Sequence, residues 1–215
     1  MRTIPMTLLA ASLALGLAAC GAPQDGVDDA ATPPTAPAPT AADAPATPAD
    51  AAAAPDLTLA STAQAVATLA ATEGSSTTGE LAFQAIDGGV AITGQVNGLE
   101  PGSEHGFHVH EVGDCSAPDG TSAGGHFNPM ATAHGRIGEG EHHVGDTDNI
   151  VADDTGVARV DTRLDGATLG DGAATDILGR AVIVHADADD YATQPTGNAG
   201  ARLACGVIEQ QAARM

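Results

Sequence analysis

Histidine is the residue type that carries the chemical signal in this sequence. Seven of the eight histidines lie between His105 and His143, a segment that contains no lysine. A single histidine is more often a satisfied surface or core residue than a ligand. A cluster of this density favours metal binding, because imidazole is the commonest metal ligand in proteins.

His108 and His110 are separated by one residue within an apolar segment. In a β-strand, residues two apart project from the same face, so both imidazoles would share one side while Phe107 and Val109 point into the core. Two imidazoles fixed on a rigid strand would make half of a metal site.

Further candidate ligands follow along the chain. They are His126, His134, His143 with Asp146, and His185 at the end of a later apolar segment. Several imidazoles without a thiolate suit Cu(II), whereas three imidazoles and a carboxylate in a tetrahedron suit zinc. The sequence therefore favours a copper site and a zinc site, with His185 available to complete the copper set.

Short apolar segments separated by turn residues predict the scaffold that would position these ligands. The expected strands are residues 79–86, 90–99, 104–112, 149–153, 157–164, 179–186 and 203–209, with hairpin turns at "DGG" and "DTG". This spacing predicts an all-β sandwich or barrel. Residues 113–148 and 187–202 are too long for simple turns, so we expect two functional loops.

The N-terminus is typical of an exported protein. Arg2 precedes an apolar segment too short to span a bilayer comfortably, and small residues lead to Cys20, which predicts a signal peptide over residues 1–19. The four residues 17–20, Leu-Ala-Ala-Cys, resemble a bacterial lipobox, which implies acylation of Cys20 and stable membrane anchoring through several acyl chains. The alternative is an ordinary signal cleaved at an Ala-x-Ala site, with Cys20 incidental.

Residues 20–60 are expected to form a disordered tether after the lipidated cysteine. They are rich in Ala, Pro, Thr, Asp and Gly and contain no aromatic residue, so they cannot bury enough apolar surface to offset the entropy of ordering. An O-modified stalk is the alternative. Residues 61–215 remain, enough for one folded domain.

The charge balance limits the partners of this chain. It has 28 acidic residues against seven basic ones, all arginine, and a net charge of −21. Nucleic acid and anionic membrane surfaces are therefore poor partners. An anionic substrate would have to be attracted by a local field that opposes the global one.

Acylation of Cys20 would leave Cys115 and Cys205 as an even pair. In an exported protein such a pair favours a disulfide, and the alternative is two buried free thiols.

Five motifs resemble the copper/zinc superoxide dismutase family. They are "GFHVHEVGDC", "TSAGGHFNP", "HVGDTDNI", "AVIVHADADD" and "TGNAGARLACGVI", in the family's order and spacing between about residues 61 and 208. The resemblance implies an eight-stranded Greek-key β-barrel or sandwich of immunoglobulin-like architecture, with two long loops over the metals. It also implies dismutation of superoxide to oxygen and hydrogen peroxide by a ping-pong Cu(II)/Cu(I) cycle that protects the cell envelope.

The resemblance, carried over position by position, implies one copper and one zinc ion per subunit. The implied copper ligands are His108, His110, His126 and His185, and the implied zinc ligands are His126, His134, His143 and Asp146. His126 would then bridge the two metals as an imidazolate. Cys115 and Cys205 match the family's intrasubunit disulfide.

Two further residues receive roles from the resemblance. Asp189 matches the carboxylate that hydrogen-bonds one copper ligand and one zinc ligand, here His108 and His134. Arg202 matches the arginine that docks superoxide. Arg202 and the proton donor His126 are the predicted catalytic residues.

Two histidines fall outside this scheme. His142 is adjacent to His143, and a shift of one residue would exchange their roles, but the motif "HVGD" begins at His143. His105 faces away from His108 and His110, so a hydrogen bond to the backbone is its expected role.

The loop after the implied last copper ligand departs from the family. Many members carry lysines there to steer superoxide inward, whereas residues 187–202 contain three aspartates and no lysine. Arg202, with Arg136 as a second candidate, would have to supply the attraction, so long-range steering should be weak.

The main alternative function is a periplasmic copper- or zinc-storage lipoprotein on the same fold. Storage needs neither Arg202 nor a bridging His126, so their presence favours the enzyme. The expected location is the periplasm, with Cys20 anchored in the cell envelope. The outer membrane is favoured because Gly21, rather than aspartate, follows the cysteine. Superoxide and the membrane are the expected partners. The sequence does not decide between a monomer and a homodimer, because the family contains both.

Overall fold

The computed structural model describes residues 64–212. The predicted signal peptide (1–19), Cys20 and the predicted tether (20–60) lie outside the described residues. Within residues 64–212, no helix has the length and hydropathy of a membrane-spanning segment.

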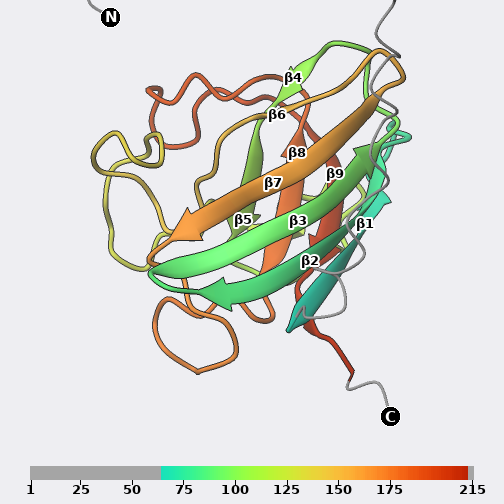
Figure 1. Ribbon diagram of the computed structural model, residues 1–215. Coiled ribbons are helices and arrows are strands. Elements are labelled where there is room, and N and C mark those ends of the chain that lie inside the picture. Colours follow the sequence, from blue (N-terminus) through green and yellow to red (C-terminus); the bar gives the residue numbers. More distant parts are fainter. Residues whose placement is uncertain (1–63, 213–215) are drawn as a thin grey trace, which may run out of the picture. The chain divides into compact units, whose positions relative to one another are not determined.

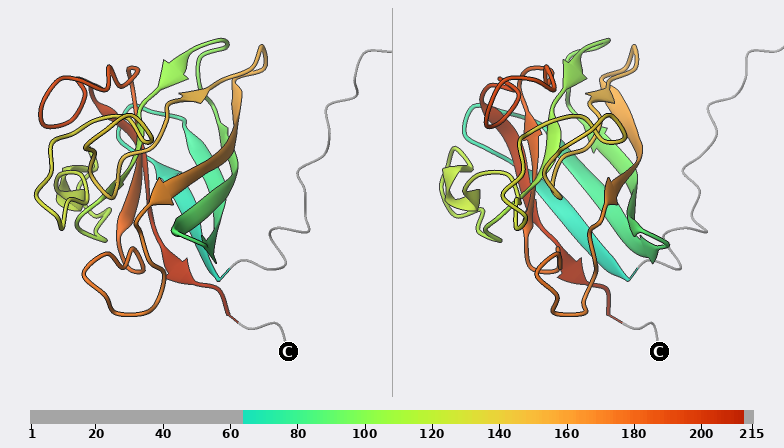
Figure 2. Two further views of the ribbon diagram at one scale, coloured as in Figure 1. Left: turned by 60° about the vertical axis from the view of Figure 1, so that its left-hand side comes forward. Right: turned by 90° about the vertical axis from the view of Figure 1, so that its left-hand side faces the viewer.

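A curled antiparallel sheet of eight strands forms the scaffold (Figures 1 and 2). Its strands are β1 (Ala65–Ala71), β2 (Thr78–Ile86), β3 (Gly89–Asn97), β5 (Phe107–His110), β7 (Val157–Asp165), β8 (Ala181–His185), β9 (Arg202–Val207) and β10 (Glu209–Gln210). The order is β5-β8-β9-β1-β2-β3-β7, with β10 paired to β1. The connections from β3 to β5, from β5 to β7 and from β7 to β8 each link strands near opposite ends of this strand order. The predicted all-β Greek-key fold is confirmed.

A second, two-stranded sheet lies between the edges of the first. β4 (Glu104–His105) pairs with β6 (Ile150–Val151). Only Gly106 separates β4 from β5, and a bridge between Ala152 and Ala158 joins the end of β6 to β7. The short sheet therefore links the β5 edge to the β7 edge.

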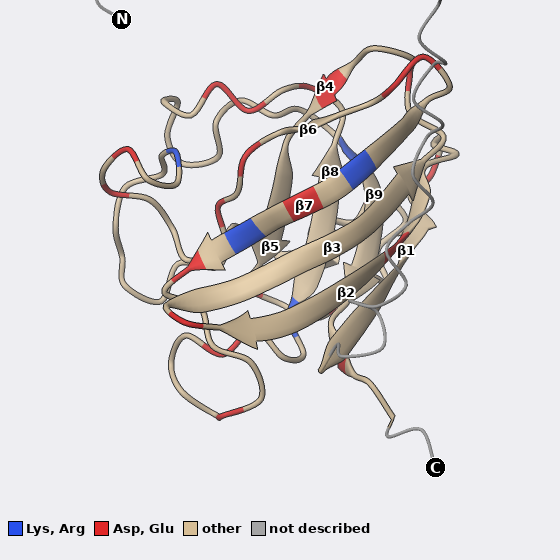
Figure 3. Cartoon of the chain, viewed as in Figure 1, with Lys and Arg blue, Asp and Glu red and all other residues tan. Residues whose placement is uncertain are grey.

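Alternating side chains explain why these segments form strands with one face in the core. On β7, Ala158, Val160 and Leu164 are buried, while Arg159 and Arg163 point outward and appear as blue bands in Figure 3. Strands β5 and β8 differ because all of their residues are buried. Their second face is covered by loops, and that covered face carries the histidines.

The predicted hairpin at "DGG" and the two long loops are confirmed. The strand expected before "DTG" instead pairs with β4 and meets β7 only at the bridge between Ala152 and Ala158, and one strand was missed. Residues 86 and 89 pair around a tight turn in which Gly88 adopts a positive φ of 78°. Strand β1 was not predicted. Its inward residues are Ala65, Ala67 and Leu69, and alanine carries little signal for a strand.

The two long loops lie over β5 and β8. The first, between β5 and β6, contains a single turn of 3₁₀ helix, η1 (Thr121–Ala123), and the second runs between β8 and β9. A disulfide between Cys115 and Cys205 joins the first loop to β9, with 5.8 Å between the two Cα atoms. This confirms the predicted pairing and fixes the first loop against the strand that begins with Arg202.

Candidate metal centre

Four buried imidazoles converge where β5 and β8 meet the first loop. They are His108, His110, His126 and His185, and their ligand atoms lie within 4.8 Å of one another. β5 contributes the first two, as the strand spacing predicted. His185 ends β8, and the backbone of His126 bridges to that of His110. The Nε2 atoms of His110 and His185 are 3.3 Å apart.

A second group shares one member with the first. It consists of His126, His134, His143 and Asp146, again with ligand atoms within 4.8 Å of one another. The Nδ1 atoms of the three imidazoles lie 2.8, 3.0 and 3.3 Å from the Asp146 carboxylate, in that order. The Asp146 side chain is fully buried and gathers the three rings around it.

Buried nitrogen atoms without partners show that these groups fit metal ions. Among residues 64–212, four buried side-chain atoms lack any hydrogen-bond partner, namely His108 Nδ1, His126 Nε2, His134 Nδ1 and His143 Nδ1. Buried polar atoms in proteins are normally paired, and each exception needs an explanation. All four belong to the two groups, where a metal ion would accept their lone pairs.

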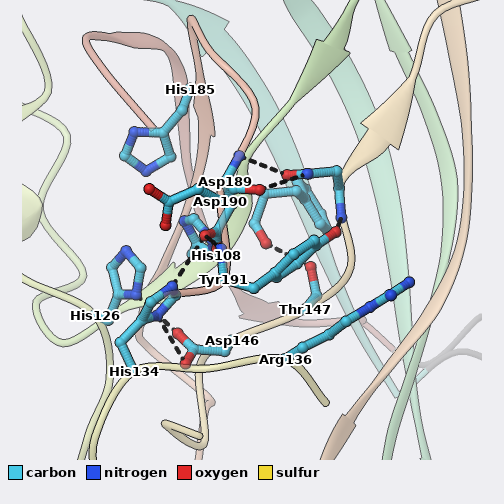
Figure 4. Close-up of polar contacts among 12 residues, drawn as sticks. His108, His126, His134, Arg136, Asp146, Thr147, His185, Asp189, Asp190 and Tyr191 are labelled. Carbon is cyan, nitrogen blue, oxygen red and sulfur yellow. Dashed lines mark hydrogen bonds and ion pairs between the residues drawn. The ribbon is translucent and has the colours of Figure 1, made fainter. Parts of the chain in front are cut away.

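His126 is the one residue that belongs to both groups. Its Nδ1 atom faces Asp146 at 2.8 Å, while its Nε2 atom is the unpaired nitrogen. The ring centroid lies 4.0 Å from that of His108 and 5.3 Å from that of His134 (Figure 4). One ring therefore presents a nitrogen to each group.

The outer ring nitrogens are fixed by hydrogen bonds. His108 Nε2 donates to Asp189 Oδ2 at 2.7 Å, and His134 Nε2 donates to Asp189 Oδ1 at 3.0 Å. His110 Nδ1 donates to the carbonyl of Gly124 at 2.9 Å. Hydrogen bonds of this kind set the tautomer and aim the other nitrogen at the metal. Both predicted contacts of Asp189 are confirmed.

The surroundings favour neutral imidazoles at His126 and His185 and ionised carboxylates at Asp146 and Asp189. Burial lowers the pKa of His185 to about 3 and that of His126 to about 4. Burial alone would raise the pKa of Asp146, but the hydrogen bond from His126 and the close imidazoles of His134 and His143 hold it well below its usual range. Asp146 and Asp189 outweigh burial at His134 and raise its pKa to about 9. The neutral rings of His126 and His185 leave lone pairs for a cation.

Arg202 is held beside the first group. It pairs with His185 across β8 and β9. The guanidinium donates from Nη1 to the carbonyl of Gly120 and from Nη2 to that of Gly124, both at 2.6 Å. The Gly124 carbonyl also accepts from His110, so one backbone atom positions both the arginine and an imidazole.

The structure also places the other histidines and the second arginine that the sequence singled out. His105 Nδ1 donates to the carbonyl of His185 at 2.8 Å, which confirms the expected backbone hydrogen bond. His143, rather than His142, lies in the second group. Arg136 forms ion pairs with Glu139 and Asp148, so nearby carboxylates compensate the charge of this second candidate for substrate attraction.

Sequence reasoning missed the residues that hold Asp189 in place. Asn149 Oδ1 accepts from the Asp189 N–H and Asn149 Nδ2 donates to the Asp189 carbonyl, both at 2.9 Å. Tyr191 Oη accepts from the backbone N–H of Asn149 at 2.8 Å. No local signal marks these residues, because their partners lie about 40 positions away in the sequence.

Comparison with known proteins points to one family. The profile of the family described as copper/zinc superoxide dismutase matches residues 77–208. "Superoxide dismutase [Cu-Zn] 1" of Aquifex aeolicus is 42% identical over 124 residues, covering 56% of this chain and 73% of the relative. "Superoxide dismutase [Cu-Zn] 3" of Arabidopsis thaliana is 44% identical over 135 residues, covering 60% and 79%.

Solved structures show the same fold. A SOD-like protein from Bacillus subtilis superposes with a TM-score of 0.60 at 38% identity, covering 66% of this chain and 95% of that chain. The clock protein EA4 gives a TM-score of 0.61 at 42% identity, covering 70% and 96%.

Gly197 provides a test of the Asp189 bridge. A Cβ atom at this position would lie 1.7 Å from Asp189 Oδ1 and 2.7 Å from His134 Nε2. Gly197→Ala should therefore displace the carboxylate and break its hydrogen bonds to His108 and His134. We expect the NMR signals of the two Nε2-bound protons to be lost or shifted.

Gly138→Ala is the matched control. Gly138 has φ +77°, against +63° for Gly197, but a Cβ atom added to it would have no other atom within 4 Å. Both substitutions carry the left-handed backbone cost of about 1–2 kcal/mol, so only Gly197→Ala adds the clash. Unchanged proton signals in Gly197→Ala would show that Asp189 does not bridge the two rings.

Proposed function

The chain belongs to the copper/zinc superoxide dismutase family, and from this premise we propose which residues hold each metal and how the substrate is handled. The family is established by the profile that matches residues 77–208 and by the relatives at 42–44% identity. The chain is accordingly a superoxide dismutase with one copper and one zinc ion.

The first group of residues is proposed to hold copper and the second to hold zinc. Four imidazoles without a carboxylate (His108, His110, His126 and His185) are a donor set that suits copper, while His126, His134, His143 and Asp146 are the three-imidazole, one-carboxylate set that suits zinc. The observation that carries this assignment is the shared ring of His126, with one nitrogen in each group. A metal-storage protein has no need for such a bridge.

Dismutation converts two superoxide anions and two protons into one molecule of oxygen and one of hydrogen peroxide. When bound, copper supplies the one-electron chemistry, and zinc, which is not redox-active in proteins, supplies charge and ligand orientation. His126 is proposed to supply a proton from Nε2. That atom is buried and unpaired among the described residues, and its ring is anchored at Nδ1 beside Asp146.

Arg202 is proposed to bind the superoxide anion. Each terminal nitrogen of its guanidinium donates one hydrogen to a backbone carbonyl, which fixes the plane of the group. The chemistry of guanidinium leaves a further N–H on each nitrogen for an anion. A half-buried position strengthens this attraction compared with bulk water. Small anions such as azide, cyanide or fluoride should compete for the same place.

The proposed site of action is the cell envelope, where the enzyme would remove superoxide outside the cytoplasm. The support for this is the signal-like N-terminus and the lipobox-like residues 17–20. Anchoring through Cys20, in the outer membrane, would keep the enzyme at the surface it protects.

Replacing the arginine tests its role in substrate binding. Arg202→Ala should lower kcat/KM for superoxide by about tenfold or more, because the local field that concentrates the anion is lost. Copper and zinc contents should stay at one each, and azide should bind more weakly. Stopped-flow assay, metal analysis and azide titration measure these three properties.

Arg159→Ala is the matched control for the lost charge. Arg159 lies on the outward face of β7 and makes no ion pair or side-chain hydrogen bond among residues 64–212. Equal effects of the two substitutions would mean that net charge, rather than binding at Arg202, governs the rate.

The dependence of the rate on salt tests the field around the site. The chain has a net charge of −21, Arg136 is paired with two acids, and the loop between β8 and β9 has no lysine. Long-range attraction should therefore be weak, and kcat/KM should change little as ionic strength rises. A steep fall with added salt, the signature of long-range steering, would contradict this expectation.

Anchoring is tested by changing the lipobox cysteine. Cys20→Ala should abolish incorporation of labelled fatty acid and shift the enzyme from the membrane fraction to the soluble periplasmic fraction, with full activity. Fatty-acid incorporation that survives Cys20→Ala would contradict anchoring through this cysteine.

A further inference from the structure

The side-chain amide of Gln194 pairs with the backbone of His134. Gln194 Oε1 accepts from the His134 N–H, and Gln194 Nε2 donates to the His134 carbonyl, both at 2.9 Å. Both peptide groups of one residue are thus engaged by one side chain. The two residues are 60 positions apart and lie in different long loops.

This contact repeats the arrangement at Asp189. There the amide of Asn149, at the end of the first loop, pairs with the N–H and the carbonyl of Asp189 in the second loop. The Gln194 contact runs in the opposite direction, from the second loop to the first. The carboxylate of Asp189 then hydrogen-bonds the ring of His134 at 3.0 Å.

His134 is therefore held at both ends by the loop between β8 and β9. Gln194 fixes its backbone and Asp189 fixes its Nε2 atom, which leaves little freedom for the Nδ1 atom beside Asp146. The neighbouring residue adds a third constraint, since the N–H of Gly135 donates to Asp146 Oδ2 at 3.2 Å. Fixing a ligand from outside in this way raises metal affinity.

Gln194 itself is exposed, while His134 is only 3% exposed. A substitution at Gln194 therefore opens no cavity in the core. Its effect would reach the interior through the two hydrogen bonds to His134.

We propose that Gln194 is a positioning residue for the zinc ligand His134, and that zinc retention depends on its two hydrogen bonds. This inference rests on the proposed assignment of the second group to zinc. The loop between β8 and β9 thereby takes part in holding zinc without contributing a ligand to that group.

The experiment follows the transfer of zinc from the copper- and zinc-loaded enzyme to a colorimetric chelator. Gln194→Ala removes both hydrogen bonds. Gln194→Glu keeps the shape and an acceptor for the His134 N–H, but it loses the donor to the His134 carbonyl. Gln95→Glu makes the same change of amide to acid on an exposed residue of β3 that has no side-chain hydrogen bond among the described residues.

We expect Gln194→Ala to release zinc about 10–100-fold faster than the wild type, the usual size of such effects. Gln194→Glu should be intermediate and Gln95→Glu unchanged, and copper release should be unchanged in all three. With Co(II) in place of zinc, Gln194→Ala should also shift the visible ligand-field bands. Circular dichroism and thermal unfolding of the metal-free variants show whether each is folded.

Two outcomes separate the inference from the assignment on which it rests. His134→Ala should lose zinc altogether, and a His134→Ala variant that keeps zinc would overturn the zinc assignment. If His134→Ala loses zinc but both Gln194 variants release it at the wild-type rate, the assignment stands and the role of Gln194 is wrong.

Discussion

The structure depends on the burial of six imidazoles and two carboxylates in one place. His108, His110, His126, His134, His143 and His185 are each at most 6% exposed, as are Asp146 and Asp189. Removing such groups from water is costly unless each polar atom finds a partner. The outer nitrogens of His108 and His134 meet Asp189, and that of His110 meets the Gly124 carbonyl. The inner nitrogens that remain unpaired need a cation. Metal binding and folding of this region are therefore coupled.

The sheet and the loops hold different residues of the metal centre. β5 and β8 are buried on both faces, so they hold His108, His110 and His185 rigidly on the face opposite the core. The remaining ligands come from a loop with little secondary structure of its own, which is held by links to other elements. The Cys115–Cys205 disulfide, the Asp189 carboxylate and the amides of the two long loops supply these links.

The charge of Arg202 differs in sign from the net charge of the chain. A chain of net charge −21 must handle an anionic substrate. In the proposed function Arg202 resolves the conflict at short range, because its guanidinium is fixed beside the first group by two carbonyls and is partly shielded from solvent. Arg136 and Arg163 are neutralised by neighbouring acids, so they add little to the field at the site. On this proposal, the placement of one arginine matters more than the total charge.

The sequence by itself determined the all-β class, the hairpin at "DGG", the disulfide pairing and the histidines that converge. These follow from alternation, turn residues and motif order, which are local properties of the chain. It did not determine β1, because Ala65 and Ala67 resemble the alanine-rich segment before them. Only the tertiary structure showed that Asn149 and Gln194 hold Asp189 and His134 and that Arg136 is paired. Side-chain amides and exposed arginines are common in loops, and their partners 40 and 60 residues away become neighbours only when the loops pack together.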